Sequence, residues 1–293
     1  MPNLSTQLAH DLTDHGIGLL RLSAATSRAL MPYLTALESD IVDRLRRSQL
    51  SASAVARLNL VLRDVRLLID QQYAEVGRAL VDRLGAVMET ESRALAAIVN
   101  GTIGVDLMSG ALPKTTLAAL SGKNFLVQGA VVGDWFKRAG ADLAFRFAVQ
   151  VRTGMGLGET TDQLLRRIVG DRTQPGIMAA PRAAVRALVQ TSVQTAANAA
   201  RLAVFKRNED VLKGVQQVST LDNRTTEICI AYDHLSWDLD GNPLPGTTLP
   251  FNGGPPRHWN CRSALIPITK TWEELGAKGI GEMSAGTRAS MDG

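Results

Sequence analysis

The side chains with the greatest chemical potential lie close together in the C-terminal part of the chain. Both cysteines, Cys229 and Cys261, and two of the four histidines, His234 and His258, fall there. Thiolate and imidazole groups are the usual ligands of tetrahedral zinc, and two ligands separated by two residues on a turn, such as His258 and Cys261, can chelate one ion. The sequence therefore offers a candidate zinc site formed by these four residues, with Asp233 as an alternative to His234.

Two other states of the cysteines remain open. A disulfide between Cys229 and Cys261 would close a loop and contribute roughly 3 to 4 kcal/mol to stability. Alternatively, both thiols stay free beside a hydrogen-bonded histidine. Two Cys-x-x-Cys pairs, the stronger signature of a structural zinc site, do not occur in this sequence. With only two cysteines, a framework of several disulfides is excluded.

The same residues also suggest a metal-dependent nuclease of the HNH kind. Such a site needs a histidine base on a strand, an intervening Asn and a later metal-binding His on a helix. Here His258 precedes Asn260, and the Pro-Pro pair just before them precludes an ordinary helix. The suggestion rests on the pair Asp233 and His234 together with His258 and Asn260. We therefore expect no catalytic residue and no enzymatic activity.

The elements that must position these residues form a small α+β domain over residues 209–268. Residues 215–219 alternate in the manner of a strand, and 6 of the 11 prolines fall between Pro243 and Pro267. Residues 269–293 follow as a tail. Its glycines and few apolar anchors predict flexibility unless a partner orders it.

The N-terminal part is predicted to be an extended helical arm over residues 1–100. Apolar residues at steps of three and four predict one helix over about 19–49 and another over about 53–98, with Ser51 or Ser53 as its N-cap. At about 1.5 Å per residue the second helix would reach roughly 65 to 70 Å, which implies a helical hairpin or rod. The first stripe consists of Leu30, Leu34, Leu37, Ile41 and Leu45.

Between the arm and the small domain, residues 101–208 are predicted to form a central helical region. Helices are expected at 125–151 and 182–207. Three glycines before Thr160 and Thr161 resemble a phosphate loop, but no apolar strand precedes them and no Gly-Lys-Ser/Thr follows. Thr160 or Thr161 is therefore expected to cap a short helix. Its buried residues would be Leu164, Leu165 and Ile168.

The fold class that follows is mainly α with a small C-terminal α+β domain. Inside the helix at 182–207, Asn198 lies among small residues. A buried Asn needs hydrogen-bond partners, so we expect a structural role for Asn198 and not a catalytic one.

Composition excludes several classes of protein. The chain has 293 residues, of which 45% are hydrophobic and 20% charged, so it is too apolar for a disordered polymer. No stretch approaches the roughly 20 uninterrupted apolar residues of a membrane span. The first 22 residues lack the basic start and apolar block of a signal peptide. We therefore expect a folded protein that is made in the cytoplasm and has no membrane-spanning segment.

Charge is unevenly distributed along the chain. Residues 1–208 hold 25 Lys or Arg against 17 Asp or Glu, whereas residues 209–293 hold 7 against 11. A basic excess on long helices fits either a solvated charged face or contact with nucleic acid or an acidic protein. Any phosphate contact would be independent of base sequence and sensitive to salt. The candidate residues for such contact are Arg44, Arg46, Arg47, Arg63 and Arg66.

A set of C-terminal residues resembles the motif of a known family. The pattern is Thr-x-Asp-x-Arg-Thr, a Cys four residues later, an acidic-Gly turn, then Pro-Pro-x-His-x-Asn-Cys-Arg and a closing Leu-x-Pro. In this chain it consists of Thr220, Asp222, Arg224, Thr225, Cys229, Pro255, Pro256, His258, Asn260, Cys261, Arg262, Leu265 and Pro267. It resembles the phage head morphogenesis or minor head proteins of the Mu-F type. With a weaker upstream likeness, the resemblance covers roughly residues 123–268.

The chain departs from that pattern at three positions. Gln190 and Ser192 stand where the family usually has Arg and Glu, which puts an ion-pairing role of that helix in doubt. Ser263 replaces a frequent final Cys, which removes a sulfur ligand from the candidate zinc site.

The resemblance implies a minor component of the virion that lies inside the head near the portal and takes part in genome packaging or ejection. Its implied partners are the portal protein, other copies of itself, the major capsid or scaffolding protein, and packaged DNA bound without sequence specificity. It does not imply an enzyme. No cofactor is certain, and the candidate zinc rests on the cysteine and histidine residues themselves. Two alternatives to a virion component stay open, namely an HNH-like nuclease and a generic helical adaptor or scaffold protein.

Overall fold

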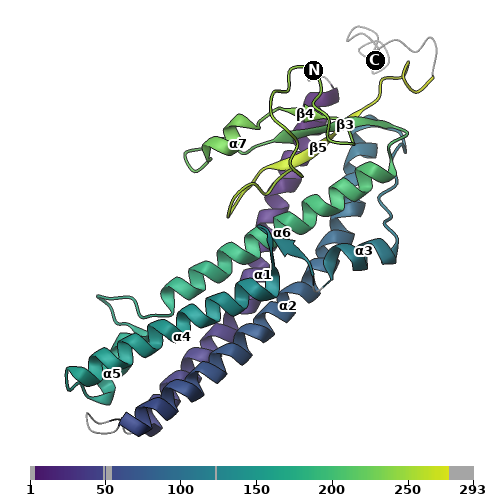
Figure 1. Cartoon of the computed structure of the whole chain (residues 1–293). Coiled ribbons are helices and arrows are strands. Elements are labelled where there is room, and N and C mark those ends of the chain that lie inside the picture. The colour runs from purple at the N-terminus through teal and green to yellow at the C-terminus, as the bar shows by residue number, and fades with distance from the viewer. Residues whose placement is uncertain (1–3, 49, 51–54, 123, 277–293) are drawn as a thin grey trace, which may run out of the picture. The chain divides into compact units, whose positions relative to one another are not determined.

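The computed structural model describes residues 4–48, 50, 55–122 and 124–276, which form mainly helices with two small sheets (Figure 1). The predicted fold class is confirmed. In chain order the elements are α1 Leu4–Ser48, α2 Val55–Ile103, α3 Lys114–Ser121, β1 Leu126–Val127, β2 Ala130–Val131, α4 Val132–Gly156, α5 Thr161–Val169, α6 Ala179–Arg207, β3 Leu212–Val218, α7 Glu227–Ala231, β4 Ser236–Trp237 and β5 Ala264–Thr269. Among the residues described, no helix has the length and hydropathy that a membrane span requires.

The two long N-terminal helices confirm the predicted helical hairpin. Helix α1 begins at Leu4, well before the predicted residue 19, and α2 ends at Ile103. The chain directions are opposite, because Arg44 lies 3.5 Å from Asp64 while Asp11 accepts a hydrogen bond from Thr102. Residues of the first stripe are at most 1% exposed. The proposed caps Ser51 and Ser53 lie outside the described residues.

The chain divides into two compact units that do not follow its linear order. Unit 1 contains residues 1–20, 85–120 and 194–293, and unit 2 contains residues 21–84 and 121–193. This division differs from the predicted consecutive segments 1–100, 101–208, 209–268 and 269–293. The physical reason is that α1, α2 and α6 each run through both units. Most of the predicted tail, including Gly279, Gly281 and Gly286, lies outside the described residues.

In unit 2, α2 and α4 approach closely at two glycines. A Cβ at Gly77 would lie 3.1 Å from Phe136, and one at Gly140 would lie 3.4 Å from Ile69 and Tyr73. The rings of Tyr73 and Phe136 are tilted at a centroid distance of 6.4 Å. Burial raises the pKa of Tyr73 above its ordinary range. Small residues on each helix thus make room for the aromatic rings of the other.

Helix α4 begins at Val132, seven residues later than predicted, because a short hairpin precedes it. Strands β1 and β2 pair antiparallel through a two-residue loop, Gln128 and Gly129, whose φ angles are 49° and 78°. Two positive φ angles match the right-handed twist of a tight hairpin. The indole of Trp135 donates to the carbonyl of Val127 at 2.7 Å and ties the hairpin to α4.

The predicted cap of α5 is confirmed. The Thr160 hydroxyl accepts from the backbone N–H of Gln163, and the Gln163 side chain accepts from the backbone N–H of Thr160. This reciprocal capping box satisfies two donors that the helix start would otherwise leave without partners. Leu164, Leu165 and Ile168 are buried as expected.

Unit 1 surrounds a three-stranded antiparallel sheet in the order β4-β3-β5. The apolar core of this unit includes Leu12, Val99, Phe205, Trp237 and Leu265. In β3, Val215 lies opposite Trp237 of β4 and Pro267 of β5. The sheet therefore shares one core with segments of α1, α2 and α6.

Two side chains of α6 hold the backbone of β5 within unit 1. Asn198 accepts from the N–H of Leu265 at 3.3 Å and donates to the carbonyl of Gln194 at 3.1 Å, so its buried amide has the hydrogen-bond partners that a buried Asn needs. Arg201 donates to the Leu265 carbonyl at 3.1 Å and to Glu91 of α2 at 2.5 Å. Both side chains of this ion pair are essentially inaccessible, at 0% and 1% exposed.

Candidate functional site

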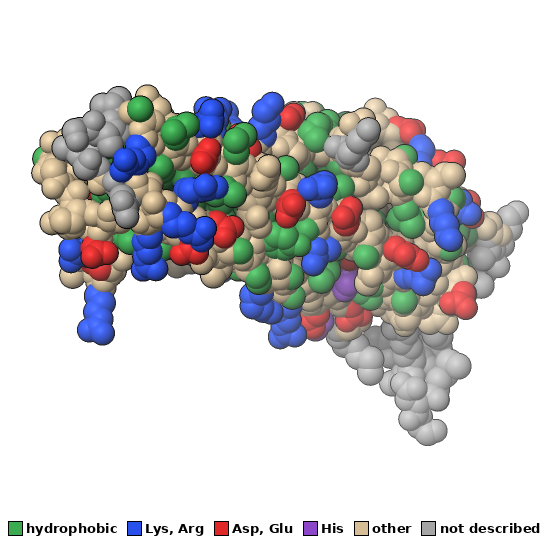
Figure 2. Space-filling view, turned by 90° about the horizontal axis from the view of Figure 1, so that it is seen from below, with side chains coloured by type: hydrophobic (Ala, Val, Ile, Leu, Met, Phe, Trp, Pro, Cys, Tyr) green, Lys and Arg blue, Asp and Glu red, His purple; other side chains and the backbone are tan. Residues whose placement is uncertain are grey.

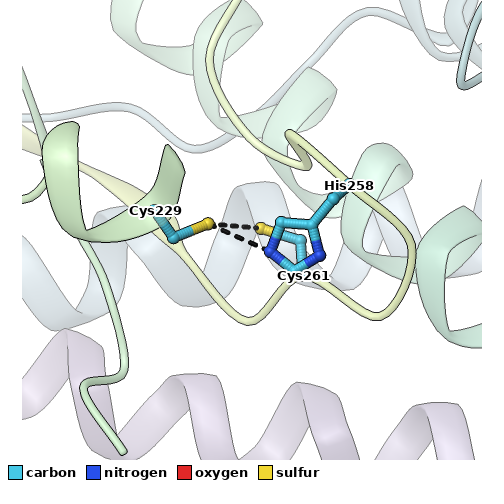
Figure 3. A group of neighbouring side chains, drawn as sticks. All are labelled: Cys229, His258 and Cys261. Carbon is cyan, nitrogen blue, oxygen red and sulfur yellow. Dashed lines mark hydrogen bonds between the residues drawn. The ribbon is translucent and has the colours of Figure 1, made fainter. Parts of the chain in front are cut away.

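Two cysteines and one histidine converge between α7 and the loop that precedes β5 (Figure 3). The Cys229 sulfur lies 3.1 Å from His258 Nε2 and 3.6 Å from the Cys261 sulfur. One ligand atom from each of the three residues lies within 4.8 Å of the others. Both thiols are free and buried, whereas His258 is half-buried. The arrangement can act as a hydrogen-bonded thiol pair or as three ligands of one metal ion.

Local backbone geometry brings these side chains together. Cys229 lies on the buried side of α7, a helix of only five residues that begins after Thr226. On the loop, Asn260 has a φ of 60°, a left-handed conformation that Asn tolerates better than most residues. The turn is closed by a hydrogen bond from the Cys261 N–H to the His258 carbonyl at 3.2 Å. Asn260 thus allows residues three apart to face the same point.

Two serines lie beside the cysteines. The Ser263 hydroxyl donates to the Ser219 hydroxyl at 3.0 Å, and Ser219 donates to the carbonyl of Cys229 at 2.9 Å. Ser263 is 2% exposed and lies near both sulfur atoms. The three-residue cluster therefore lies in a polar and closed surrounding.

The two thiols titrate as a pair. The hydrogen bond with Cys229 lowers the pKa of Cys261, and backbone hydrogen bonds from Arg257 and Ser263 act in the same direction. For Cys229, the hydrogen bond with Cys261 and burial both raise the pKa of the thiol. One of the two sulfurs is therefore much more easily deprotonated than the other, which is expected when two ionisable groups share one proton.

Within the motif, Asp222 pairs more closely with the distant Arg262 than with its near neighbour Arg224. Asp222 accepts two hydrogen bonds from Arg262, both at 2.6 Å, which is the bidentate geometry that Arg favours. Neighbouring Arg224 lies 3.7 Å from Asp222 and is 76% exposed. The hydrogen bonds from Arg262, followed by one from the Arg224 backbone, hold the pKa of Asp222 well below its usual range. Thr225 donates to the Thr220 carbonyl at 2.5 Å.

Asp233 and His234 are not part of the cysteine cluster. His234 Nδ1 lies 2.7 Å from the Asp233 carboxylate, and the His234 side chain is 71% exposed. The other Asp233 oxygen accepts from the Ser219 N–H at 2.7 Å. Across the described ranges, the metal-ligand group comprises Cys229, His258 and Cys261 without either residue. The four ligands named on the sequence are thus reduced to three that lie together.

The motif also contains an interaction that the sequence analysis missed. The Arg257 guanidinium lies 3.3 Å above the ring of Tyr232, and its Nε donates to Gln217 at 2.8 Å. Arginine is the cation most often found over an aromatic face. Arg257 is adjacent to His258, and Tyr232 directly follows α7, so this contact joins the two segments that carry the cysteines. No spacing in the sequence indicates which aromatic ring Arg257 would meet.

The arginines named for phosphate contact lie on α1 and α2 of unit 2, and most have a carboxylate nearby. Arg47 lies 3.6 Å from Asp43, Arg63 lies 3.8 Å from Asp64, and Arg66 lies 3.8 Å from Asp70. Arg44 also reaches Asp64, and Arg46 is exposed. On the face in Figure 2, basic and acidic side chains are interspersed. Such pairing reduces, but does not cancel, the local positive charge.

Comparison with known proteins gives one match to a family model. The matching family is described as Phage Mu protein F like protein, and the match covers residues 146–266. These residues include α5, α6, the three-stranded sheet up to β5 and the whole cysteine cluster. No curated protein and no solved structure matches the chain. Residues 146–266 of this chain are therefore similar to the phage Mu protein F like family, and this match supports the resemblance to phage head morphogenesis proteins.

Proposed function

We propose that this protein is a minor component of the phage head that associates with the portal inside the capsid and takes part in genome packaging or ejection. The observation that carries the proposal is the family match over residues 146–266. Long helices support it, because they give a small chain a large surface for neighbouring subunits. On α4, Phe145 is 68% exposed and Val149 is 40% exposed, four residues apart on the same helix face. We place the contact with a neighbouring subunit on this pair.

We further propose that the protein acts through assembly and not through catalysis. His258, the histidine closest to a catalytic arrangement, bonds to the Cys229 sulfur through Nε2 and to the Trp259 carbonyl through Nδ1, at 3.1 and 2.8 Å. Both ring nitrogens are therefore engaged. Asp233 and His234 pair with each other. These contacts favour an architectural cluster over an HNH-like nuclease.

Copurification with the portal protein tests the proposed location. When the full chain is produced with the portal protein of the same phage, we expect the two to purify together, and we expect mass spectrometry to detect the chain in assembled heads. The double substitution Phe145→Ser and Val149→Ser should reduce copurification at least tenfold while the protein stays folded. Exposed Leu60 and Leu67 of α2, changed to Ser in the same way, provide the matched control. Absence of the chain from purified heads would refute the proposed location.

Contact with packaged DNA is a separate part of the proposal. Unit 2 holds the basic excess, with ten Lys or Arg against seven Asp or Glu in residues 21–84 and ten against five in residues 121–193. We expect weak binding to DNA of any sequence, with an affinity that falls steeply as salt rises because counterions are released. Changing Arg44, Arg46 and Arg47 to Glu should weaken binding at least tenfold at low salt.

The matched control for DNA binding is charge reversal in unit 1. Lys206, Lys213 and Arg224 are 57%, 49% and 76% exposed, and changing all three to Glu alters the net charge by the same amount. This control should leave DNA affinity nearly unchanged. Equal losses from both triple variants would show that total charge, and not the surface of unit 2, governs binding. An affinity that does not vary with salt would exclude the proposed phosphate contact.

A further inference from the structure

We propose that Cys229, His258 and Cys261 bind one zinc ion. In a tetrahedral site, Zn–S bonds of about 2.3 Å and Zn–N bonds of about 2.0–2.1 Å place neighbouring ligand atoms about 3.5–3.8 Å apart. The observed sulfur-to-sulfur distance of 3.6 Å matches this separation, and the Cys229 sulfur-to-His258 nitrogen distance of 3.1 Å is slightly shorter. Two of the three ligand-to-ligand distances are thus close to those of a tetrahedral site, and all three ligand atoms lie within 4.8 Å of one another.

The orientation of His258 supports a ligand role. Its Nδ1 lies 2.8 Å from the backbone carbonyl of Trp259, which can only accept a hydrogen bond. Nδ1 therefore carries the proton in the neutral ring, and the lone pair of Nε2 points toward Cys229. Metal-binding histidines commonly donate their second ring N–H to a backbone carbonyl in this way, which fixes the tautomer and the ring orientation.

The chemistry of the cysteines also favours zinc. A soft thiolate pair with one imidazole is a donor set typical of zinc sites. On binding, the ion displaces the remaining thiol protons to solvent, so no oxidant or reductant is required. A disulfide between Cys229 and Cys261 would use the same sulfur atoms, and the two states therefore exclude each other.

Ser263 lies beside both sulfur atoms of the candidate site. It is buried, it follows Cys261 by two residues, and its hydroxyl lies near both cysteine sulfurs while it donates to the Ser219 hydroxyl. A neutral serine hydroxyl is a weak zinc ligand compared with a thiolate. We therefore place Ser263, or a water held by it, at the fourth corner. A thiol at this position would complete a set of three sulfurs and one nitrogen.

Metal titration of the full chain tests this site directly. Protein purified under reducing conditions and freed of metal by a chelator is titrated with Zn²⁺ and, separately, with Co²⁺ as a spectroscopic probe. We expect one equivalent of zinc per chain and the visible absorption bands of tetrahedral cobalt. Cys229→Ser, Cys261→Ser and His258→Ala should each weaken zinc affinity at least a hundredfold. His234→Ala should not change it, because His234 lies outside the cluster.

Two further measurements keep the proposal falsifiable if a ligand variant fails to fold. In the unaltered protein, zinc should slow thiol labelling of Cys229 and Cys261 at least tenfold. Ser263→Cys should tighten zinc binding at least tenfold. The proposal is overturned if the unaltered protein takes up no zinc, if labelling is the same with and without zinc, if Ser263→Cys leaves affinity unchanged, or if freshly purified protein contains a Cys229–Cys261 disulfide.

Discussion

Replacing Arg201 with Met is expected to lower the free energy of unfolding by about 3–5 kcal/mol, because the substitution leaves a buried carboxylate without its charged partner. Arg201 and Glu91 are 0% and 1% exposed, so solvent cannot compensate for the lost ion pair. After the substitution, Glu91 would keep only His15, whose Nε2 lies 2.6 Å away. The variant would also lose the hydrogen bond from Arg201 to the Leu265 carbonyl of β5. Urea denaturation followed by circular dichroism measures the change as a lower midpoint.

Two controls separate the buried ion pair from a general effect of losing charge. Arg93 and Glu89 form an exposed pair on α2, at 73% and 51% exposed, and Arg93→Met should cost at most about 1 kcal/mol. The double variant Arg201→Met with Glu91→Leu should recover much of the stability, because it removes both charges together. If Arg201→Met costs no more than Arg93→Met, the buried pair does not stabilise the fold.

The Glu91 carboxyl gives this ion pair a pH dependence of known sign. Burial by itself would raise the pKa of Glu91, but the charge of Arg201 and the contact with His15 outweigh it, and the net pKa is below the ordinary 4.5. A carboxyl group whose pKa is lower in the folded state than in the unfolded state stabilises the protein at pH values above its unfolded-state pKa. That contribution is lost as pH falls below about 4.5, toward the lower folded value. The double variant should therefore lose less stability than the unaltered protein between pH 5 and about pH 3.

The elements that the sequence predicts well are those governed by local chemistry. The apolar period of α1 identifies its buried face, and Thr160 followed by Gln163 identifies the start of α5, because both signals depend on residues within one or two helical turns. The hairpin before α4 escaped prediction because its turn uses Gln128 in a left-handed conformation that usually selects Asn or Gly.

Contacts between distant residues could not be predicted from the sequence in the same way. Arg201 pairs with Glu91 across 110 positions, and Asp222 pairs with Arg262 across 40. The sequence does indicate that Arg201 is unusual. It is the one charged residue between Arg186 and Lys206, and it falls on the buried face of α6. Such a residue must find a partner, but nothing local identifies which carboxylate it meets.

The cysteine cluster lies between these two cases. Residue types and the His258–Cys261 spacing predicted a shared site, and the structure brings Cys229 to it. His234 does not join, because its exposed ring pairs with Asp233 on the preceding position. Ser263, noted on the sequence as the position of a missing cysteine, lies beside the sulfur atoms. The family motif thus combines residues that build the cluster with residues, such as Asp222 and Arg262, that brace the chain around it.

Trp237 is the second position where a large loss of stability is expected. Its side chain is 0% exposed, and its ring lies 5.9 Å from that of Tyr232 and 5.4 Å from that of Phe251. The indole N–H donates to the Leu249 carbonyl at 2.9 Å. Trp237→Ala would remove these contacts and leave a cavity in the core of unit 1, at a cost of about 3–5 kcal/mol. Chemical denaturation measures this cost, and Trp272→Ala, at a side chain that is 37% exposed, is the matched control.

The same substitution should also affect the cysteine cluster, because Tyr232 directly follows α7, the helix that carries Cys229. Without the Trp237 ring, Tyr232 loses its stacking partner, and Arg257 loses the fixed ring beneath its guanidinium. Faster thiol labelling of Cys229 under native conditions is therefore expected in Trp237→Ala and not in Trp272→Ala. A large loss of stability with unchanged labelling would show that the cluster is held by Asp222, Arg262 and the loop alone, independently of the aromatic core.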